Sequence, residues 1–343
     1  MGTERDNSVC FSFGVIADIQ YADVEDGYNF MKTRKRYYRN SITLLSEAVE
    51  EWNKDCMPPS FILQLGDIID GLNAQHKASK KALKNVMQEF KKSKADIHHI
   101  WGNHEFYNFS RHCLMSSALN SQHLGNSMTP ASSNRVNSNV GEDKQETFYC
   151  YDFCPFPSFR FVVIDCYDLS TLGREDCSKK YQESLKIIRK INKNEDLNNP
   201  EGLGAAKQRF VQFNGGLSQD QLEWLDEVLS YSDENQEKVI VVGHIPVHPC
   251  AADTICLVWN FDDVLAVLYS HKCVVSFMAG HDHDGGYFQD ERGIHHITFE
   301  GVIETPPTSH AFGTVFVYKD KMILKGNGRV PHRVMPYPEC DNQ

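Results

Sequence analysis

Five short segments of the chain carry residue types that bind metal ions. They are Asp18-Ile19-Gln20, Gly66-Asp67-Ile68-Ile69-Asp70, Gly102-Asn103-His104-Glu105, Gly243-His244 and Gly280-His281-Asp282-His283. Carboxylate and amide oxygens mixed with imidazoles, with no thiolate among them, suit borderline to hard cations such as Mn, Fe, Zn or Mg. A glycine before a ligand lets the backbone turn sharply and approach an ion closely. A single Gly-Asp or Gly-His pair is usually an ordinary turn, but five such segments in one chain predict a metal centre.

The hydrophobic pattern predicts that each segment follows a strand. The strands expected before the five segments span 10–17, 61–65, 97–101, 238–242 and 274–279. Helical spacing of apolar residues predicts helices over 38–52, 77–92, 178–193 and 219–229, the last opened by a capping box of Ser218 and Gln221. Further strands are expected over 148–153, 160–164, 294–299, 314–318 and 322–324, and we assign the last three to a second sheet. This alternation predicts an α/β fold with a site at the carboxyl ends of the strands.

The metal-binding segments run from residue 18 to residue 283, which indicates one catalytic domain that uses most of the chain. We place this domain at 8–330 and treat 331–343 as a C-terminal tail. Residues 108–146 are rich in Ser and Asn and lack periodicity. Strands resume directly after them, so we interpret 108–146 as an insertion or lid, because long loops in compact domains are usually functional or mobile.

Composition excludes several functional classes. The 343 residues are 41% hydrophobic and 24% charged with a net charge of −11, and the one basic run, 32–36, is expected on the solvent face of a helix. We therefore expect no nucleic-acid partner, and an anionic substrate would need local cations to attract it. Eleven cysteines without a CxxC pair indicate reduced thiols in a cytoplasmic protein rather than a disulfide framework. No apolar run approaches the roughly 18 residues of a membrane span, and the charged N-terminus lacks a secretory signal. We expect no membrane attachment and a cytoplasmic, monomeric protein.

The order of the five segments resembles the calcineurin-like metallophosphoesterase superfamily over residues 14–283. The resemblance implies a four-layer α/β/β/α sandwich of two mixed sheets flanked by helices, with two divalent metal ions at the sheet edges. It also implies ligands for one ion at Asp18, Gln20 and His283, ligands for the other at Asn103, His244 and His281, and a bridge between both ions at Asp67. His104 resembles the imidazole that stabilises the phosphoryl oxygens or protonates the leaving oxygen, and Asp70 resembles its carboxylate partner.

The residue types themselves are compatible with a dinuclear centre. Two divalent ions about 3.5–4 Å apart repel strongly unless a carboxylate and a hydroxide lie between them, and Asp67 is suited to bridge them because it follows a glycine at a strand end. Two dications less the carboxylates of Asp18 and Asp67 and one hydroxide leave a formal charge of +1, so the site stays electrophilic in an acidic protein. Each ion also lowers the pKa of bound water toward about 7, which makes hydroxide available at neutral pH.

Two positions depart from related patterns. Most members of the superfamily carry His where this chain has Gln20, and the harder amide oxygen favours Mn²⁺, with Zn, Fe, Co or Mg as further candidates. The alternative is that Gln20 binds no metal and the ion takes an extra water. Asp70 stands where purple acid phosphatases carry a metal-binding Tyr, which argues against that branch and against a ferric ion. For His104 the alternative is simple packing, and Glu105 and Asp282 are expected to support the ligands or to cap helices.

Three segments together resemble one branch of the superfamily, which cleaves the diphosphate bond of nucleoside diphosphate conjugates. The segments are Asp18-x-Gln20, Asn214-Gly215-Gly216-Leu217 and Gly243-His244-Ile245-Pro246. The resemblance implies cleavage of ADP-ribose to AMP and ribose 5-phosphate, and of CDP-choline or CDP-glycerol to CMP and the phosphoalcohol, by attack of a metal-bridging hydroxide. The residues alone support only hydrolysis of a phosphate ester or anhydride.

Substrate contacts are expected from two sources. The backbone amides of Asn214, Gly215 and Gly216 could approach the distal phosphate. Aromatic side chains near the metal edge could stack on a base, and packing in the core is the alternative for each of them. The candidates are Phe30, Phe106, Tyr107, Phe210 and Trp259.

Two rival functions stay open at this point. A cyclic-nucleotide phosphodiesterase or a phosphomonoesterase could use the same dinuclear centre. A scaffold that kept the fold and lost its activity would belong to a different class. Degenerate relatives usually lose several ligands, whereas here only one position departs, and conservatively, so the sequence favours an active hydrolase.

Overall fold

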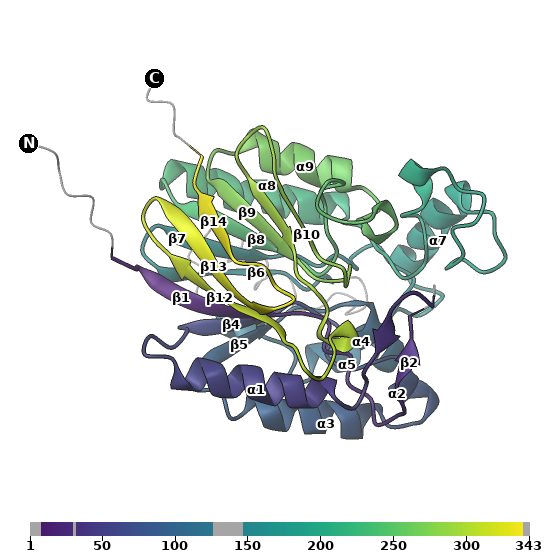
Figure 1. The fold of residues 1–343 in the computed structure, drawn as a ribbon. Coiled ribbons are helices and arrows are strands. Elements are labelled where there is room, and N and C mark those ends of the chain that lie inside the picture. The colour runs from purple at the N-terminus through teal and green to yellow at the C-terminus, as the bar shows by residue number, and fades with distance from the viewer. Residues whose placement is uncertain (1–7, 30–31, 126–146, 339–343) are drawn as a thin grey trace, which may run out of the picture.

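Two six-stranded mixed sheets form the centre of the structure (Figure 1), a computed structural model that describes residues 8–29, 32–125 and 147–338. The first sheet has the order β14-β13-β12-β1-β4-β5. Its strands are β1 (Phe11–Ile16), β4 (Phe61–Gln64), β5 (Asp96–His99), β12 (Ala311–Val317), β13 (Lys321–Gly328) and β14 (Arg333–Pro336). Strand β1 pairs in parallel with β4 and antiparallel with β12, so segments from the two ends of the chain meet in the middle of this sheet.

The second sheet has the order β10-β11-β9-β8-β7-β6. Its strands are β6 (Tyr151–Phe156), β7 (Phe159–Val163), β8 (Lys238–Val242), β9 (Val274–Ala279), β10 (Gly286–Gln289) and β11 (His295–Thr298). The inner strands β7, β8, β9 and β11 run parallel, and an antiparallel strand closes each edge. A two-stranded ribbon, β2 (Gly27–Tyr28) and β3 (Lys35–Arg36), lies outside both sheets.

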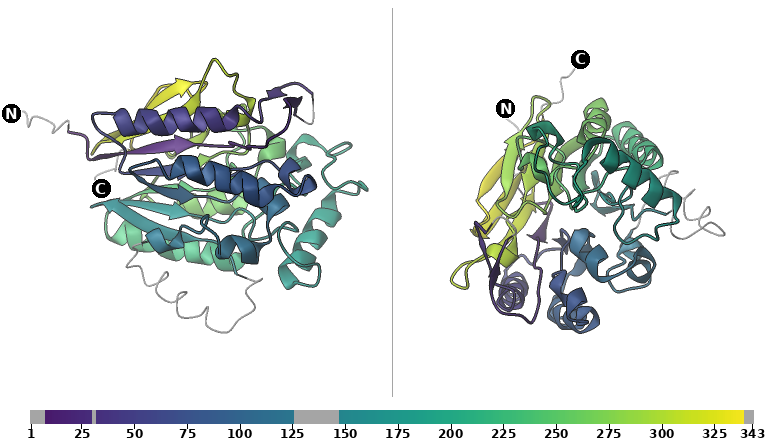
Figure 2. Two further views of the ribbon diagram at one scale, coloured as in Figure 1. Left: turned by 90° about the horizontal axis from the view of Figure 1, so that it is seen from below. Right: turned by 90° about the vertical axis from the view of Figure 1, so that its right-hand side faces the viewer.

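Helices cover the outer face of each sheet. Helices α1 (Ser41–Lys54) and α3 (Ser79–Phe90) lie side by side against the first sheet (Figure 2), and α8 (Gln219–Glu234) and α9 (Phe261–Ser270) lie against the second. The remaining described helices are α2 (Leu72–Gln75), α4 (Asn103–Asn108), α5 (Arg111–Met115), α7 (Lys179–Ile191) and the short 3-10 turns η1 (Gln122–Leu124), η2 (Ala205–Lys207), η3 (Thr254–Cys256) and η4 (Val302–Glu304). The predicted four-layer α/β/β/α sandwich of two mixed sheets flanked by helices is confirmed.

A cluster of phenylalanine rings joins the two sheets. Phe13 and Phe61 come from the first sheet, and Phe153 and Phe161 come from the second. The ring centroid of Phe161 lies 5.1 Å from that of Phe13 and 5.0 Å from that of Phe61, and Phe153 lies 5.2 Å from Phe61. These separations are typical of favourable edge-to-face contacts. The cluster therefore packs one sheet against the other in the interior of the sandwich.

The structure corrects the strand assignments near the C-terminus. Of the three strands expected in the second sheet, only β11 belongs there, because β12 and β13 cross back and extend the first sheet beside β1. The expected tail at 331–343 is also wrong in its described part, since β14 pairs with β13. Helix α9 was not expected, because a short apolar run cannot be distinguished from a strand by periodicity alone.

The expected insertion at 108–146 is shorter than the sequence suggested. Residues up to 125 form the end of α4, then α5 and η1, and they pack against the core. Arg111, Leu114 and Leu119 are buried in this segment. Its helices are too short to show a periodic pattern, which explains the error. Residues 126–146 lie outside the described part of the chain.

Two further features follow from the described ranges. Ten of the eleven cysteines lie in them, while Cys340 lies outside, and no two of these ten are joined by a disulfide bond. Within the same ranges, every helix is too short or too polar to cross a bilayer.

The buried guanidinium of Arg111 provides a test of how the segment after α4 is anchored. Its Nη1 lies 2.5 Å from Asp165 Oδ2 and its Nη2 donates to the Tyr167 carbonyl at 2.8 Å. Arg111→Ala should lower the free energy of unfolding by about 3–5 kcal/mol, because it leaves a buried carboxylate without its partner. Urea unfolding measures this loss, with the exposed Arg189→Ala as the control. A loss for Arg111→Ala no larger than that of the control would contradict the assignment.

Candidate metal centre

The predicted ligand positions converge where strands of both sheets end. Asp18 follows β1 and Asp67 follows β4 in the first sheet, while His244 follows β8 and His281 follows β9 in the second. The carboxyl ends of these strands lie at one edge of the sandwich, as expected for an α/β site. A cavity of about 480 Å³ opens at this edge, and its lining includes Gln20, Asp67, Asn103, His104, His281 and His283.

One group of possible ligand atoms lies close to the Asp67 carboxylate and includes two histidines that follow strands of the second sheet. Ligand atoms of Asp67, His244 and His281 all lie within 4.8 Å of one another. His244 Nε2 is 3.1 Å from His281 Nδ1 and 3.5 Å from Asp67 Oδ2. Asn103 lines the same cavity, and its Oδ1 accepts a hydrogen bond from the Tyr167 hydroxyl at 3.1 Å, which orients the amide.

A second group of ligand atoms shares the same carboxylate. Gln20 Nε2 lies 3.2 Å from Asp67 Oδ2 and 3.0 Å from His283 Nε2, and His283 Nε2 lies 3.4 Å from Asp18 Oδ1. Asp18 Oδ1 and Gln20 Oε1 are buried without a hydrogen-bond partner. Because the two ends of an amide exchange places when it flips, the Gln20 oxygen can take the position of its nitrogen. Two orphaned oxygens beside an imidazole nitrogen are a donor set that fits a hard or borderline cation.

Two of the three imidazoles, those of His244 and His283, have a hydrogen-bond acceptor next to the ring nitrogen that points away from the cluster. His244 Nδ1 lies 2.7 Å from the Leu65 carbonyl, and His283 Nδ1 lies 3.0 Å from Glu304 Oε1. Because these acceptors cannot donate, each ring in its neutral form carries its proton there. The unprotonated Nε2 of His244 then faces Asp67, and that of His283 faces Asp18 and Gln20. Such outer partners fix the tautomer of a metal-binding histidine.

The backbone at the site adopts left-handed conformations that non-glycine residues rarely take. The φ angles are 50° at Asp18, 43° at Gln20, 57° at Asp67 and 70° at His281, four of the eight positive values among described non-glycine residues. Each such conformation costs about 1–3 kcal/mol unless its surroundings impose it. Their concentration at one place indicates that the fold tolerates a local conformational cost in order to orient these side chains toward the site.

Glu105 supplies the support for the strained turn at Asp67. This buried carboxylate accepts hydrogen bonds from the amides of Asp67 at 2.8 Å, Ile68 at 2.7 Å and Gly102 at 2.6 Å. The turn after β4 and the start of α4 are thereby tied to a single side chain. This geometry agrees with the supporting role expected for Glu105. Asp282 likewise accepts from the amide of Asp253, at 2.7 Å.

The ionisable groups of the site influence one another. Burial raises the pKa of Asp67, but the facing His244, His104 and His281 lower it by more, so it lies below its ordinary value. Burial lowers the pKa of His281 well below its ordinary value, and His244 adds to this effect. For His244 the effect of burial is outweighed by Asp67, which raises the pKa to about 9. Since ligation needs neutral imidazoles, metal ions that bind here would displace such protons.

His104 faces the cavity from the first turn of α4. Its Nδ1 lies 2.8 Å from the Gly71 amide nitrogen and 3.4 Å from Asp70 Oδ2, and its Nε2 lies 3.9 Å from Asp67 Oδ2. The Gly71 N–H needs a lone pair on Nδ1, which favours the tautomer with its proton on Nε2. The ring is then oriented to donate from Nε2 into the cavity, and Asp70 stands within ion-pair distance behind it.

A cation that sequence reasoning placed elsewhere also reaches the cavity. The basic run 32–36 was expected on a helix, but Lys35 and Arg36 form strand β3. Arg36 lines the cavity, where it is the one Lys or Arg among the described lining residues. Its Nε lies 3.3 Å from Glu304 Oε1, and its Nη1 lies 3.9 Å from Asp70 Oδ2. The local cation that an anionic substrate requires is therefore present.

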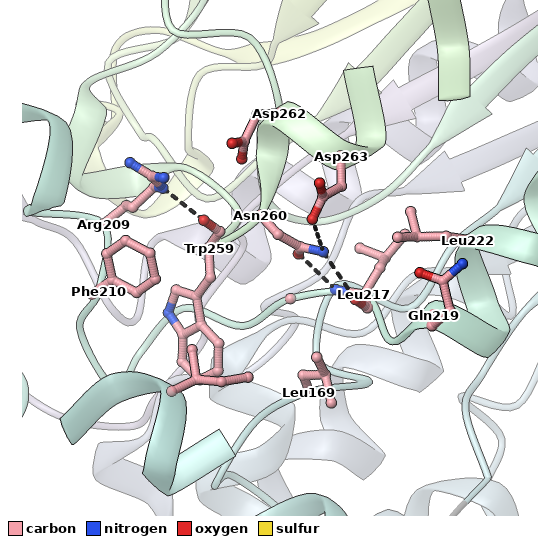
Figure 3. Close-up of a pocket in the computed structure, with 12 residues that line it drawn as sticks. Leu169, Arg209, Phe210, Leu217, Gln219, Leu222, Trp259, Asn260, Asp262 and Asp263 are labelled. Atoms are coloured by element: carbon pink, nitrogen blue, oxygen red, sulfur yellow. Dashed lines mark hydrogen bonds between the residues drawn. The ribbon is translucent and has the colours of Figure 1, made fainter. Parts of the chain in front are cut away.

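The residues expected to contact substrate are distributed differently from the prediction. Phe210, Gly216 and Trp259 line a separate cavity of about 400 Å³ (Figure 3). The amide of Gly216 is already bonded to the Leu169 carbonyl at 2.9 Å and that of Asn214 to the Val211 carbonyl at 3.2 Å, so these two amides are not free to bind a phosphate, and of the three candidates only the Gly215 amide is left for that role.

The other aromatic candidates also divide between core and cavity. Phe106 is buried in the core, Tyr107 lines the metal-site cavity, and Phe30 lies outside the described residues. Phe213, which the sequence analysis did not single out, lines the metal-site cavity too. Residue type alone cannot separate a core aromatic from one that faces a ligand.

Comparison with known proteins gives consistent results for family, sequence and fold. A family model described as calcineurin-like phosphoesterase matches residues 11–285, a range that contains all seven predicted ligands. A Bos taurus protein named manganese-dependent ADP-ribose/CDP-alcohol diphosphatase is 56% identical over 327 residues, covering 95% of this chain and 94% of the relative. The Homo sapiens protein of the same name is 55% identical over 327 residues, covering 95% and 93%. The crystal structure of a dimetal phosphatase from Danio rerio superposes with a TM-score of 0.89 at 50% identity, covering 96% of this chain and 100% of that one.

A substitution at Gly102 tests whether the site needs the close packing of this backbone against the Asp67 and His244 side chains. A Cβ added at Gly102 would lie 2.1 Å from Asp67 Oδ1 and 2.6 Å from His244 Cε1. Gly102→Ala should therefore displace the Asp67 carboxylate and weaken divalent-metal binding at least 10-fold, as loss of a well-placed supporting contact does. Isothermal titration with Mn²⁺ measures the change. Gly204→Ala is the control, because a Cβ there meets no atom within 4 Å. Unchanged metal affinity in Gly102→Ala would refute this geometry.

Proposed function

The chain belongs to the calcineurin-like phosphoesterase family and is a metal-dependent hydrolase, and from that premise we propose that it cleaves the diphosphate bond of ADP-ribose and CDP-alcohols at a two-manganese centre. The observation that carries the proposal is the shared carboxylate of Asp67, which borders two groups of metal-ligand atoms. Relatives that carry this activity in their names match the chain over nearly its whole length.

We assign the metal ligands as the sequence predicted them. One ion would be held by Asp18, Gln20 and His283, the other by Asn103, His244 and His281, and Asp67 would bind both. Support comes from the orphaned oxygens of Asp18 and Gln20 and from the acceptors behind the imidazoles of His244 and His283. The amide oxygen of Gln20 replaces a softer imidazole nitrogen, which favours Mn²⁺ at this position.

The side chains around the ions would divide the work of hydrolysis. When bound, the two ions lower the pKa of a coordinated water toward about 7 and withdraw negative charge from the phosphate. His104 would donate from Nε2 to a phosphoryl oxygen or to the leaving oxygen, with Asp70 behind its Nδ1. Arg36, which lines the cavity, would hold the second phosphate. AMP and CMP are good leaving groups, so only modest acid assistance is needed.

A substrate panel tests the proposal directly. The protein is treated with a chelator, reloaded with Mn²⁺, and given ADP-ribose, CDP-choline, cyclic AMP or p-nitrophenyl phosphate. We expect AMP and ribose 5-phosphate in equal amounts from ADP-ribose, CMP and phosphocholine from CDP-choline, and no turnover before reloading. Faster opening of cyclic AMP or faster release of inorganic phosphate would favour a phosphodiesterase or monoesterase instead. No turnover of any substrate would support an inactive scaffold.

Arg36 should contribute more to diphosphate substrates than to monoesters. A hydrogen bond to a charged group contributes about 1.5–3 kcal/mol. Arg36→Gln should therefore lower kcat/KM for ADP-ribose by about 10–100-fold, and it should lower that for p-nitrophenyl phosphate far less, because this ester has no second phosphate. Arg36→Lys should recover part of the loss. The exposed Arg39→Gln serves as the control. Equal losses on both substrates would show that Arg36 acts only through Glu304 and Asp70.

A further inference from the structure

We infer that Asn214 is a positioning residue of the metal centre, which fixes the tautomer of His281 so that this ring presents Nδ1 to the ion. Asn214 was expected to contact substrate through its backbone amide, and its side chain lies next to His281, one of the proposed metal ligands. The inference rests on the ligand set proposed above. It adds Asn214, which is not itself a ligand, and it states which ring nitrogen of His281 would bind the ion.

The contact between the two side chains is short, and it is buried on the Asn214 side. Asn214 Oδ1 lies 2.7 Å from His281 Nε2, and Asn214 has no exposed surface. The Asn214 amide cannot flip, because its Nδ2 donates to the Arg209 carbonyl at 2.9 Å and to the Ile255 carbonyl at 2.6 Å. A flipped amide would turn its oxygen toward two other oxygens. The Oδ1 atom is therefore locked as an acceptor facing His281.

A locked acceptor decides where the His281 proton lies. An amide oxygen can only accept, so the proton of the neutral ring must be on Nε2, and Nδ1 keeps its lone pair. Nδ1 is the atom that faces the ligand cluster, at 3.1 Å from His244 Nε2. His244 and His283 have the opposite arrangement, with Nδ1 turned to the outer acceptor and Nε2 turned inward. Of the three imidazoles, His281 alone presents Nδ1, and its outer partner is a neutral amide.

The loop that carries Asn214 is itself braced. Arg209 Nε donates to the Trp259 carbonyl at 2.7 Å, and the Trp259 amide donates to the Gly215 carbonyl at 2.8 Å. Trp259 Nε1 donates to the Val211 carbonyl at 3.2 Å. Figure 3 shows Arg209 next to Trp259 with the hydrogen bond between them. Two residues of the second cavity, Arg209 and Trp259, thus link the segments on either side of Asn214 by hydrogen bonds.

Removal of the Asn214 oxygen should weaken the binding of one metal ion only, the one that His281 would hold. In Asn214→Ala, the buried Nε2–H of His281 loses its acceptor, and the ring is free to rotate or to move its proton to Nδ1. Loss of such an outer partner typically weakens metal binding 10–100-fold. The other ion keeps Asp18, Gln20 and His283, which do not touch Asn214.

Isothermal titration of the full chain with Mn²⁺ tests the inference. The wild type should bind two ions, and Asn214→Ala should keep one at the original affinity while the other weakens about 10–100-fold. Turnover of ADP-ribose by the variant should recover as the Mn²⁺ concentration rises. Asn260→Ala is the matched control, since Asn260 braces the same loop at Leu217, with contacts of 3.0 and 3.1 Å, and touches no imidazole.

The outcomes separate this inference from the proposed function. A wild type that binds no Mn²⁺ would overturn the proposed function itself. Wild-type binding by Asn214→Ala, or an equal loss in Asn260→Ala, would overturn the role of Asn214 and leave the proposed function standing. Nitrogen-15 NMR of the metal-free wild type gives a test that needs no variant. We expect the His281 signal of the Nε2–H tautomer, and a proton on Nδ1 would overturn the inference.

Discussion

The arrangement of the site depends on one buried carboxylate, that of Asp67, which lies next to two groups of possible ligand atoms. Asp67 Oδ2 lies 3.2 Å from Gln20 on one side and 3.5 Å from His244 on the other. Two cations close together are unstable unless negative charge lies between them. A carboxylate that bridges two ions would need a fixed position, and the left-handed backbone of Asp67 and the three amide hydrogen bonds to Glu105 give the Asp67 carboxylate such a position.

The two-sheet architecture is what allows this carboxylate to be surrounded. Asp18 and Asp67 come from the first sheet, and His244 and His281 come from the second, so the site forms only if the two sheet edges stay in register. The phenylalanine cluster packs the two sheets against each other. Polar contacts behind the site then orient the imidazole rings. Arg36 lies between Glu304, which holds His283, and Asp70, which stands behind His104, so the two flanks of the cavity are electrostatically connected.

The sequence predicted which candidate ligands come together better than it predicted their surroundings, and the reason is physical. A ligand that directly follows a strand is placed by local chain geometry, so residue type and order were enough for Asp18, Asp67 and His281. The roles of Glu304 and Asn214 arise from contacts across the fold, and neither lies at a fixed spacing from the histidine it holds. The return of β12 and β13 to the first sheet was missed for the same reason, because periodicity reveals a strand and not its neighbour.

The most direct test of the shared carboxylate is anomalous diffraction at the Mn absorption edge from crystals grown with Mn²⁺. Two peaks about 3.5–4 Å apart are expected, one on each side of the Asp67 carboxylate. The peak near His281 should lie on the Nδ1 side of that ring. A single peak, or peaks that do not flank Asp67, would contradict the dinuclear account.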